Sequence, residues 1–486
     1  MDADTIPSTG NERVVFVKRP GENAPPSSDC FRCEPCHVPQ VTELKPGQCI
    51  VRTLYLSVDP AQRCRMNPST GVDYLAPYEP GELVDGLEGI GIVETASSDC
   101  VLNAGDIVTS CAHLWPWTRK FIADSSDLVK VHLPSGFSPS VILSCAGISG
   151  MTALVGIRKK ALIDRTKPQT IVISAAAGSC GVLAGQIARL EGCTKVIGIC
   201  GSEAKCKVLV DELQFDAAIN YKGEAIGEKL SVLAPEGVDI YWDNVGGFIS
   251  DAVIQKMNDD GRIVLCGQIA VYNTDLPYPP PIPPETIKII NEKRILRERY
   301  LCLAYKEEMD SAVAQLSLWL QEGKLKVRET IYTGLSAAPL AFVDMMAGKN
   351  IGKMMMEVLN DRVTLLSNYE VLTLLQETKK MEDKKNKGKC QSLGTVLFET
   401  SKYLRTTPCA TQTPECIATL IREMTKFNLT AAEIMQIINL RPTTATEVQL
   451  LVEESEERFK TEEQLNNIVK IITETLPPPA QNQESS

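Results

Sequence analysis

Long apolar runs are missing from this sequence of 486 residues. No stretch reaches the roughly 18 consecutive apolar residues of a membrane-spanning helix, so we expect no membrane span. The opening residues, MDADTIPSTGNER, lack the apolar core of a secretory signal, so we expect no export. A formal net charge of −11 argues against a surface that coats nucleic acid. The length suggests about three domains.

Histidine is scarce, with only His37, His113 and His132 in the chain. A catalytic zinc site draws histidine and cysteine from separate loops onto one face. Glu88, in the segment DGLEGIGIVE, has no histidine beside it. The sequence also offers no evident Ser/His/Asp or Cys/His set for nucleophilic catalysis. Zinc chemistry and a protein nucleophile are therefore both disfavoured.

Cysteine is abundant, with 17 residues, which we interpret as reduced thiols because no secretory signal is present. The sharpest cluster is Cys30, Cys33, Cys36 and His37, whose spacing could supply three thiolates and an imidazole to a metal ion. Four ligands within eight residues wrap an ion poorly, and the flanking residues resemble a strand. Small apolar thiols near a strand are the favoured interpretation, and a metal site is the alternative.

Two patterns divide the chain before residue 359. Residues 11–130 carry short runs of β-branched and aromatic residues between prolines and glycines, which predicts an irregular barrel or sandwich. Residues 140–275 alternate short apolar strands with helical segments, which predicts a parallel, doubly wound sheet. The segment YPPPIPPE at 278–285 is expected to be a surface loop.

Beyond Val358 the strand pattern ends, and the sequence predicts a separate all-helical domain. Helices are expected at roughly 395–406, 412–426 and 430–440, followed by an acidic helix within 448–465 and a further apolar stretch to Leu476. Residues 379–389 are expected to form a lysine-rich connector, and residues 477–486 a disordered tail.

A small-residue turn, SAAAGSCG at 174–181, follows a predicted strand and opens a predicted helix. Such a turn lets backbone N–H groups approach a pyrophosphate, although it can also serve packing alone. Its glycines, Gly178, Gly181 and Gly185, do not follow the GxGxxG spacing that is usual in a dinucleotide-binding turn. The next strand, KVIGICGS, ends without the acid of an NAD site. Ser202 and Lys205 follow it and favour the 2′-phosphate of NADP(H), unless Lys205 is only a surface lysine.

Residues 11–358 resemble the zinc-independent branch of the medium-chain dehydrogenase/reductase family, and within it the prostaglandin reductases. The strings VRTLYLSVDP, RCRMN, DAAINYK, DNVGG and NIGK carry this resemblance. It implies an α/β fold with a β-rich GroES-like substrate domain, 11–140 plus 315–358, and a Rossmann NADPH-binding domain, 141–314. It also implies NADPH-dependent reduction of the carbon–carbon double bond of an α,β-unsaturated ketone, as in a 15-oxoprostaglandin 13-reductase of prostaglandin metabolism.

The resemblance also implies a set of site residues and no metal. Tyr272 matches a tyrosine whose hydroxyl points toward the substrate carbonyl. Substrate contacts are expected from Tyr74, His113 and Leu114. Cofactor contacts are expected from Gly178, Ser179, Cys180, Gly181, Lys205, Tyr221, Asn244, Cys266, Gly267, Gln268, Ile269, Ala270, Val271, Tyr272, Tyr300, Leu301, Cys302 and Asn350.

Enone chemistry then suggests a mechanism. Hydride reaches the β-carbon and negative charge develops on the ketone oxygen, where the Tyr272 hydroxyl or a cofactor ribose hydroxyl would donate a hydrogen bond. Solvent can protonate the α-carbon. The sequence departs from the family at CAHLWPW, which has two extra residues, and at Tyr300, where phenylalanine is usual. These departures concern the identity of the lipid substrate and not the reaction. A general alkenal or quinone reductase is therefore an alternative.

Residues 365–476 resemble the helical stalk-subunit family of RNA polymerase III, with an HRDC-like all-α fold. LLSNYEVLTLL, NLRPTTATEV and LVEESEERF carry this resemblance. It implies a non-catalytic domain of transcription initiation that pairs with an OB-fold stalk subunit and makes no direct nucleic acid contact. It also implies that this domain acts in the nucleus, whereas the reductase is expected in the cytoplasm. As an alternative, the role as a transcription partner is the main function of the whole chain. A gene fusion, or two neighbouring genes joined as one, would explain the combination.

Overall fold

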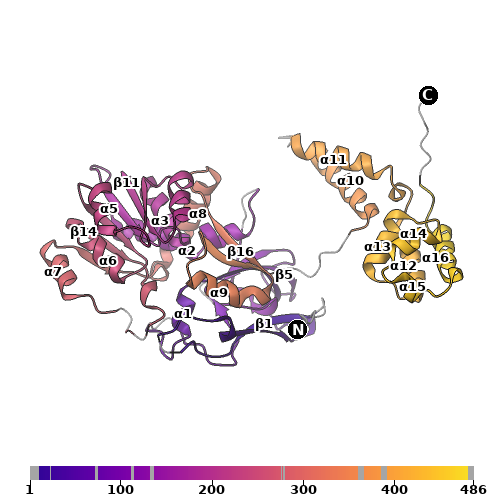
Figure 1. Ribbon diagram of the computed structural model, residues 1–486, viewed down its shortest axis with the longest axis horizontal. Helices are drawn as coiled ribbons and strands as arrows, with labels where there is room; N and C mark the ends of the chain where they lie inside the picture. The colour runs from indigo at the N-terminus through magenta and orange to yellow at the C-terminus, as the bar shows by residue number, and fades with distance from the viewer. Residues whose placement is uncertain are drawn as a thin grey trace. The chain divides into compact units, whose positions relative to one another are not determined.

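The computed structural model describes residues 10–21, 23–71, 75–110, 114–131, 136–274, 276, 280–358, 366–384 and 391–479. The chain forms two compact units, residues 1–361 and residues 362–486, and each is described by itself (Figure 1). Within the described residues, no helix combines the length and the apolar character needed to cross a membrane.

The β-rich part of the first unit is built on a seven-stranded sheet. Its central strand β3 pairs with β5 on one side, with β17 near its carboxyl end and with β8 near its start. Gly89 is required in β5, because a Cβ there would lie 2.3 Å from the Trp115 ring. The sheet strands are β16 (Glu329–Thr333), β17 (Lys353–Glu357), β3 (Gln48–Ser57), β5 (Gly89–Ala96), β6 (Ile107–Ser110), β9 (Leu128–Lys130) and β8 (Lys120–Asp124).

Smaller elements close this β-rich part. Two two-stranded sheets pair β1 with β2 and β4 with β7. The core beneath them contains Phe16, Trp117 and Phe342, all fully buried. The elements are β1 (Asn11–Phe16), β2 (Phe31–Cys36), β4 (Asp85–Gly86), β7 (Trp115–Pro116), α1 (Ala61–Arg65) and α9 (Ala338–Met346).

The second part of this unit is a parallel, doubly wound sheet with the order β12-β11-β10-β13-β14-β15. The apolar strand TIVIS is buried throughout, as expected of a strand covered on both faces. The strand order reverses between β10 and β13, where open α/β sheets bind their ligands. The strands are β10 (Thr170–Ser174), β11 (Lys195–Cys200), β12 (Ala217–Asn220), β13 (Val238–Asp243), β14 (Met257–Leu265) and β15 (Leu296–Arg299).

Helices cover both faces of the parallel sheet. Helices α2 (Ile148–Gly156), α3 (Ser179–Leu190) and α8 (Met309–Gln321) share one core cluster. Helices α5 (Ile226–Leu233), α6 (Gly247–Ile254) and α7 (Pro284–Glu292) contribute to the other. The boundary expected at 314–315 falls inside α8, whose Leu316 and Leu320 pack in the first cluster. The GroES-like plus Rossmann architecture predicted from the sequence is confirmed.

The second unit is entirely helical in its described residues, as predicted. Its main core gathers apolar side chains from the last helices, among them Leu420, Ile437, Val448 and Ile468. Thr430 and Thr444 each form a capping box with a glutamate three residues later. The helices are α10 (Asn368–Lys384), α11 (Gln391–Leu404), α12 (Pro414–Met424), α13 (Ala431–Leu440), α14 (Ala445–Leu451), α15 (Ser455–Arg458) and α16 (Glu462–Thr475).

Two sequence-based predictions in this unit are wrong. The single acidic helix over 448–465 is three helices, α14, α15 and the start of α16. The chain breaks because the buried Glu433 carboxylate accepts the Glu453 N–H at 3.1 Å and the Arg458 guanidinium at 2.6 Å. The connector over 379–389 is helical as far as Lys384, within α10. Residues 385–389 and 480–486 lie outside the described residues.

Candidate functional site

The turn between β10 and α3 has the shape of an anion cradle. Gly178 is the N-cap of α3, and the first N–H groups of a helix have no partner within that helix. A Cβ at Gly181 would lie 2.5 Å from the Ala175 carbonyl oxygen, so only glycine fits there. The Ser179 hydroxyl oxygen is buried and has no hydrogen-bond partner among the described residues. This turn fits a pyrophosphate at a helix N-terminus.

The returning β-rich segment reaches the same turn. The Gly352 N–H donates to the Ala177 carbonyl at 2.8 Å, and Gly352 forms a parallel bridge with Gly178. The Asn350 amide donates to the Gly352 carbonyl at 2.8 Å. Asn350, predicted to contact the cofactor or the substrate, therefore lies beside the glycine-rich turn, although 172 positions separate it from Gly178 in the sequence.

Residues predicted for the adenosine phosphate gather at the end of β11. Ser202 caps the short helix α4 (Glu203–Lys207) by accepting the Lys205 N–H at 3.3 Å. The Lys205 ammonium donates to the Gly348 carbonyl at 2.6 Å, and burial lowers its pKa. The Tyr221 ring packs beside Gly201. The Lys205 ammonium and the Ser202 and Tyr221 hydroxyl groups thus gather at the turn where a 2′-phosphate would bind, and Lys222 also lies beside Gly201.

The predicted nicotinamide side lies at the carboxyl ends of β10, β13 and β14. The Asn244 amide donates to the Ser174 carbonyl at 2.7 Å and its oxygen accepts from the Trp242 indole at 3.1 Å, so Asn244 ties two strand ends together. The Cys266 and Gly267 N–H groups donate to the Asp243 carbonyl and hold the segment that follows β14 against this edge.

Tyr272 ends this segment and faces a cavity of about 320 Å³. Its hydroxyl accepts the Gln268 N–H at 3.4 Å. Leu114, a predicted substrate contact, is exposed at 38%. Tyr74 and His113 lie outside the described residues. The cavity is lined by Cys64, Asn67, Pro68, Ser69, Thr70, Gly71, Val271, Tyr272, Thr274 and Leu276.

Tyr300 and its neighbours lie behind this edge, against α2. The Tyr300 hydroxyl donates to the Thr152 carbonyl, and its ring packs edge-on to Trp242 at 6.1 Å. Burial raises the Tyr300 pKa well above its usual value. The Thr152 hydroxyl also donates to the Cys302 sulfur at 3.3 Å. The structure therefore directs the Tyr300 hydroxyl toward α2 and leaves it a packing role.

A buried charge cluster beside the turn was not found by sequence reasoning. The Lys353 ammonium, with a side chain 1% exposed, donates to Asp59 at 2.7 Å and to the Ser149 hydroxyl at 3.2 Å. Glu88 accepts the Ile148 N–H through one oxygen at 2.6 Å, and its other oxygen has no partner among the described residues. Burial raises the Glu88 pKa to about 7.

Two partly exposed thiols adjoin this cluster. Cys180, the second residue of α3, is in hydrogen-bonding contact with Cys266 and with the Ser149 hydroxyl. The Cys266 hydrogen bond and the Lys353 charge lower the pKa of Cys180, whereas that of Cys266 is raised. Both cysteines were predicted as cofactor-lining positions, and the structure brings them together.

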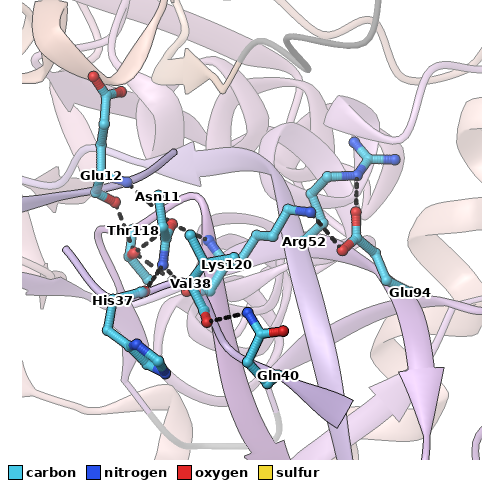
Figure 2. Close-up of polar contacts among 9 residues, drawn as sticks. All are labelled: Asn11, Glu12, His37, Val38, Gln40, Arg52, Glu94, Thr118 and Lys120. Carbon is cyan, nitrogen blue, oxygen red and sulfur yellow. Dashed lines mark hydrogen bonds and ion pairs between the residues drawn. The ribbon is translucent and has the colours of Figure 1, made fainter. Parts of the chain in front are cut away.

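The cysteine–histidine cluster near the N-terminus is dispersed. Cys33 and Cys36 lie three positions apart on β2, so their side chains point to opposite faces of the strand. Burial raises the Cys33 pKa to about 12. His37 pairs with Glu43 at 2.8 Å, and Figure 2 shows its backbone carbonyl accepting from the Asn11 amide while the imidazole points elsewhere. This arrangement favours the interpretation as thiols near a strand.

Comparison with known families agrees with this architecture. The family described as the N-terminal domain of oxidoreductase matches residues 12–131, and the family described as zinc-binding dehydrogenase matches residues 180–314. Within the described part of the chain, no three His, Cys, Asp or Glu side chains are placed to hold a metal ion. The family described as RNA polymerase Rpb4 matches residues 365–476.

Relatives that match along almost their whole length decide the family. The "Putative NADP-dependent oxidoreductase YfmJ" of Bacillus subtilis is 37% identical over 355 residues, which span 72% of this chain and 98% of that protein. The chain belongs to the medium-chain dehydrogenase/reductase family. Prostaglandin reductase 1 of Mus musculus is 35% identical over 321 residues, which span 65% of this chain and 91% of that protein.

Solved structures also match the first unit. CurA from Vibrio vulnificus, determined in complex with NADPH, is 31% identical with a TM-score of 0.65, and the match covers 72% of this chain and 99% of CurA. The quinone oxidoreductase of Escherichia coli, also complexed with NADPH, has a TM-score of 0.56 at 21% identity and supports the fold alone.

Proposed function

We propose that the first unit reduces the carbon–carbon double bond of α,β-unsaturated ketones, with NADPH as the cofactor. The carrying observation is the position of Tyr272, which faces the cavity from the segment that follows β14, at the carboxyl edge of the parallel sheet. The glycine-rich turn, where the buried Ser179 hydroxyl has no partner among the described residues, fits the pyrophosphate. Lys205 supplies the cation for the 2′-phosphate. The NADP-dependent relatives and the NADPH-bound neighbours support the same cofactor.

The side chains of this unit would bind and polarise the reactants. NADPH, when bound, supplies the hydride that adds to the β-carbon. The Tyr272 hydroxyl donates a hydrogen bond to the ketone oxygen, where negative charge develops, and such donors act strongly because they are already in place. Solvent delivers the proton to the α-carbon. Cys266 to Val271 line the nicotinamide half, and the remaining strand-end residues hold this segment in place.

The physiological substrate is proposed to be a 15-oxoprostaglandin. Prostaglandin reductase 1 of the mouse, at 35% identity, supports this choice. The E. coli relative described as "NADPH-dependent curcumin reductase", at 33% identity over 356 residues, supports a broader enone range. A general alkenal or quinone reductase is the alternative. We also propose a cytoplasmic location for the reductase.

An assay of NADPH oxidation separates these substrates. The full chain is supplied with a 15-oxoprostaglandin, a short alkenal or a quinone, and NADH replaces NADPH as the control. We expect the highest kcat/KM with the prostaglandin and little activity with NADH. A preference for the quinone or alkenal would support the alternative, and no turnover of any of them would overturn the proposed activity.

We propose a second function for residues 365–476, association with the OB-fold stalk subunit of RNA polymerase III in the nucleus. The Rpb4 match supports it. Co-purification of the full chain with that subunit tests this function. Folded full-length protein that fails to retain the subunit would contradict it, whatever the reductase assay shows.

A further inference from the structure

We propose that Asn67 is a substrate-binding residue, whose side-chain amide donates a hydrogen bond to a second oxygen of the enone, away from the reacting ketone. The inference rests on the proposed function, because it assigns a substrate class to the cavity that Tyr272 lines. That class consists of enones that carry a further hydroxyl, carbonyl or carboxylate oxygen. Enones with a plain hydrocarbon tail fall outside it.

A buried arginine fixes the orientation of the Asn67 amide. Arg63, on helix α1, is 1% exposed, and its Nη1 donates to Asn67 Oδ1 at 2.6 Å. Because arginine carries only donors, the amide atom that faces it must be the oxygen. The amide nitrogen of Asn67 is therefore turned away from the guanidinium. Within the described part of the chain, this nitrogen donates no hydrogen bond.

The same guanidinium is anchored on two further sides. Its Nε donates to Asn273 Oδ1 at 2.9 Å, and its Nη2 donates to the Ala24 carbonyl at 3.0 Å. Asn273 directly follows Tyr272, so Arg63 ties the two walls of the cavity together, although 210 positions separate it from Asn273. Since three bonds hold Arg63 in place, the Asn67 amide is already oriented before a ligand arrives.

Asn67 is partly exposed and lines the cavity, where other polar side chains use their protons within their own loops. The Thr70 hydroxyl donates to the Leu75 carbonyl at 2.9 Å, and the Thr274 hydroxyl donates to the Val271 carbonyl at 2.8 Å. A ligand that fills the cavity displaces water from the Asn67 amide, and burying a donor without an acceptor is costly. A substrate oxygen offers that acceptor, whereas a hydrocarbon tail does not.

Binding of two enones to the full chain, measured by calorimetry with saturating NADP⁺, tests this role. NADP⁺ carries no hydride, so the enones bind without being reduced. A 15-oxoprostaglandin offers ring oxygens and a carboxylate, whereas non-3-en-2-one has only its ketone oxygen. Asn67→Asp keeps an oxygen toward Arg63 but replaces the donor with an acceptor. We expect its Kd to be at least about tenfold higher for the prostaglandin and unchanged for non-3-en-2-one.

Asn273→Asp is the matched control. It places the same charge beside the same guanidinium, and Asn273 lies outside the described lining of the cavity. This variant should leave the ratio of the two Kd values unchanged. Asn67→Ala removes the donor without adding a charge, and it should shift the ratio in the same direction as Asn67→Asp.

The remaining outcomes would overturn the role of Asn67. They are equal shifts for both enones, a shifted ratio in Asn273→Asp, an unchanged ratio in the two Asn67 variants, or no binding of the prostaglandin to the wild type. The NADPH oxidation assay on the same preparations separates this inference from the proposed function. A shifted ratio in a chain without turnover refutes only the reductase, whereas turnover with an unchanged ratio refutes only the role of Asn67.

Discussion

Single side chains decide how this cleft would stabilise charge. Tyr272 lines the cavity and its hydroxyl accepts the Gln268 N–H, and Lys353 brings a buried positive charge close to the glycine-rich turn. Burial acts to lower the Lys353 pKa, but Asp59 and Glu88 outweigh it and raise that pKa. With one cation and two carboxyl groups, the cluster is neutral only when one carboxyl holds a proton, and Glu88 is the one whose pKa is raised.

Tyr272→Phe removes the proposed donor to the ketone oxygen. We expect kcat for enone reduction to fall by about 10²–10³, the usual loss when one such donor is removed. The Kd for NADPH should stay unchanged, which fluorescence titration measures. Tyr332→Phe serves as the control, since its hydroxyl bonds Asp344 on α9. An unchanged kcat in Tyr272→Phe would assign the donor to a cofactor ribose hydroxyl.

Glu88→Gln tests the buried carboxyl through its pH dependence. The Glu88 pKa is about 7 in the folded protein, against an ordinary 4.5, so folding takes up a proton and the free energy of unfolding falls as pH rises between these values. Glu88→Gln should remove this pH dependence. The free energy of unfolding of the variant should therefore rise relative to that of the wild type by roughly 3 kcal/mol between pH 4 and pH 8. Urea unfolding followed by tryptophan fluorescence measures it, because all four tryptophans lie before residue 359. Parallel curves for the two proteins would contradict a buried, protonated Glu88.

At the scale of elements, the strand–turn–helix unit of β10 and α3 organises the cofactor site. Its position could be predicted from the sequence, because an apolar strand, a turn of small residues and a segment with helical apolar spacing follow one another directly. Gly181→Ala should place a Cβ 2.5 Å from the Ala175 carbonyl and weaken NADPH binding at least about tenfold. Gly227→Ala in α5 is the matched control, since its Cβ would lie 3.8 Å from the Lys256 side chain, an ordinary contact away from this turn. Equal Kd values for the two variants would refute the steric argument.

Glu433→Gln tests the element that breaks the expected acidic helix. Burial acts to raise the Glu433 pKa, but bonds from Arg458 and from the Thr430 and Glu453 N–H groups bring it down to about 2. The ionised Glu433 carboxylate therefore stabilises the folded unit fully above pH 4.5, and this stabilisation is lost as pH falls toward 2. At pH 7 we expect faster hydrogen exchange over 448–465 in the variant, and little difference near pH 2. The exposed Glu456→Gln should behave as wild type, and equal exchange in all three at pH 7 would contradict the role of Glu433.

Sequence reasoning succeeded where neighbouring residues carry the signal and failed where distant residues meet. The turn at 174–181 and the helix predicted at roughly 430–440 rest on local patterns. The pairing of Lys353 with Asp59 joins positions 294 apart, although both lie in strings, NIGK and SVDP, that carried the family resemblance. The break near Glu453 likewise depends on Glu433, 20 positions earlier. The Tyr300 hydroxyl faces α2 because Thr152 offers it a carbonyl that no sequence pattern announces.

For the whole molecule, two compact units that match different family models share one chain. The first contains both parts of the reductase fold, the seven-stranded sheet and the parallel doubly wound sheet. The second has its own apolar core and capping boxes. A transcript that spans residues 350–370 would support a gene fusion, and two separate transcripts would indicate neighbouring genes.

The central claim, hydride transfer to the β-carbon of an enone, is tested most directly by the position of an isotope label. The full chain is supplied with an enone and with NADPH deuterated at the transferred position of the nicotinamide, and the product is analysed by NMR. We predict a saturated ketone with deuterium at the β-carbon and a solvent-derived proton at the α-carbon. Deuterium at the carbonyl carbon of an alcohol product, or no transfer of label, would contradict the account.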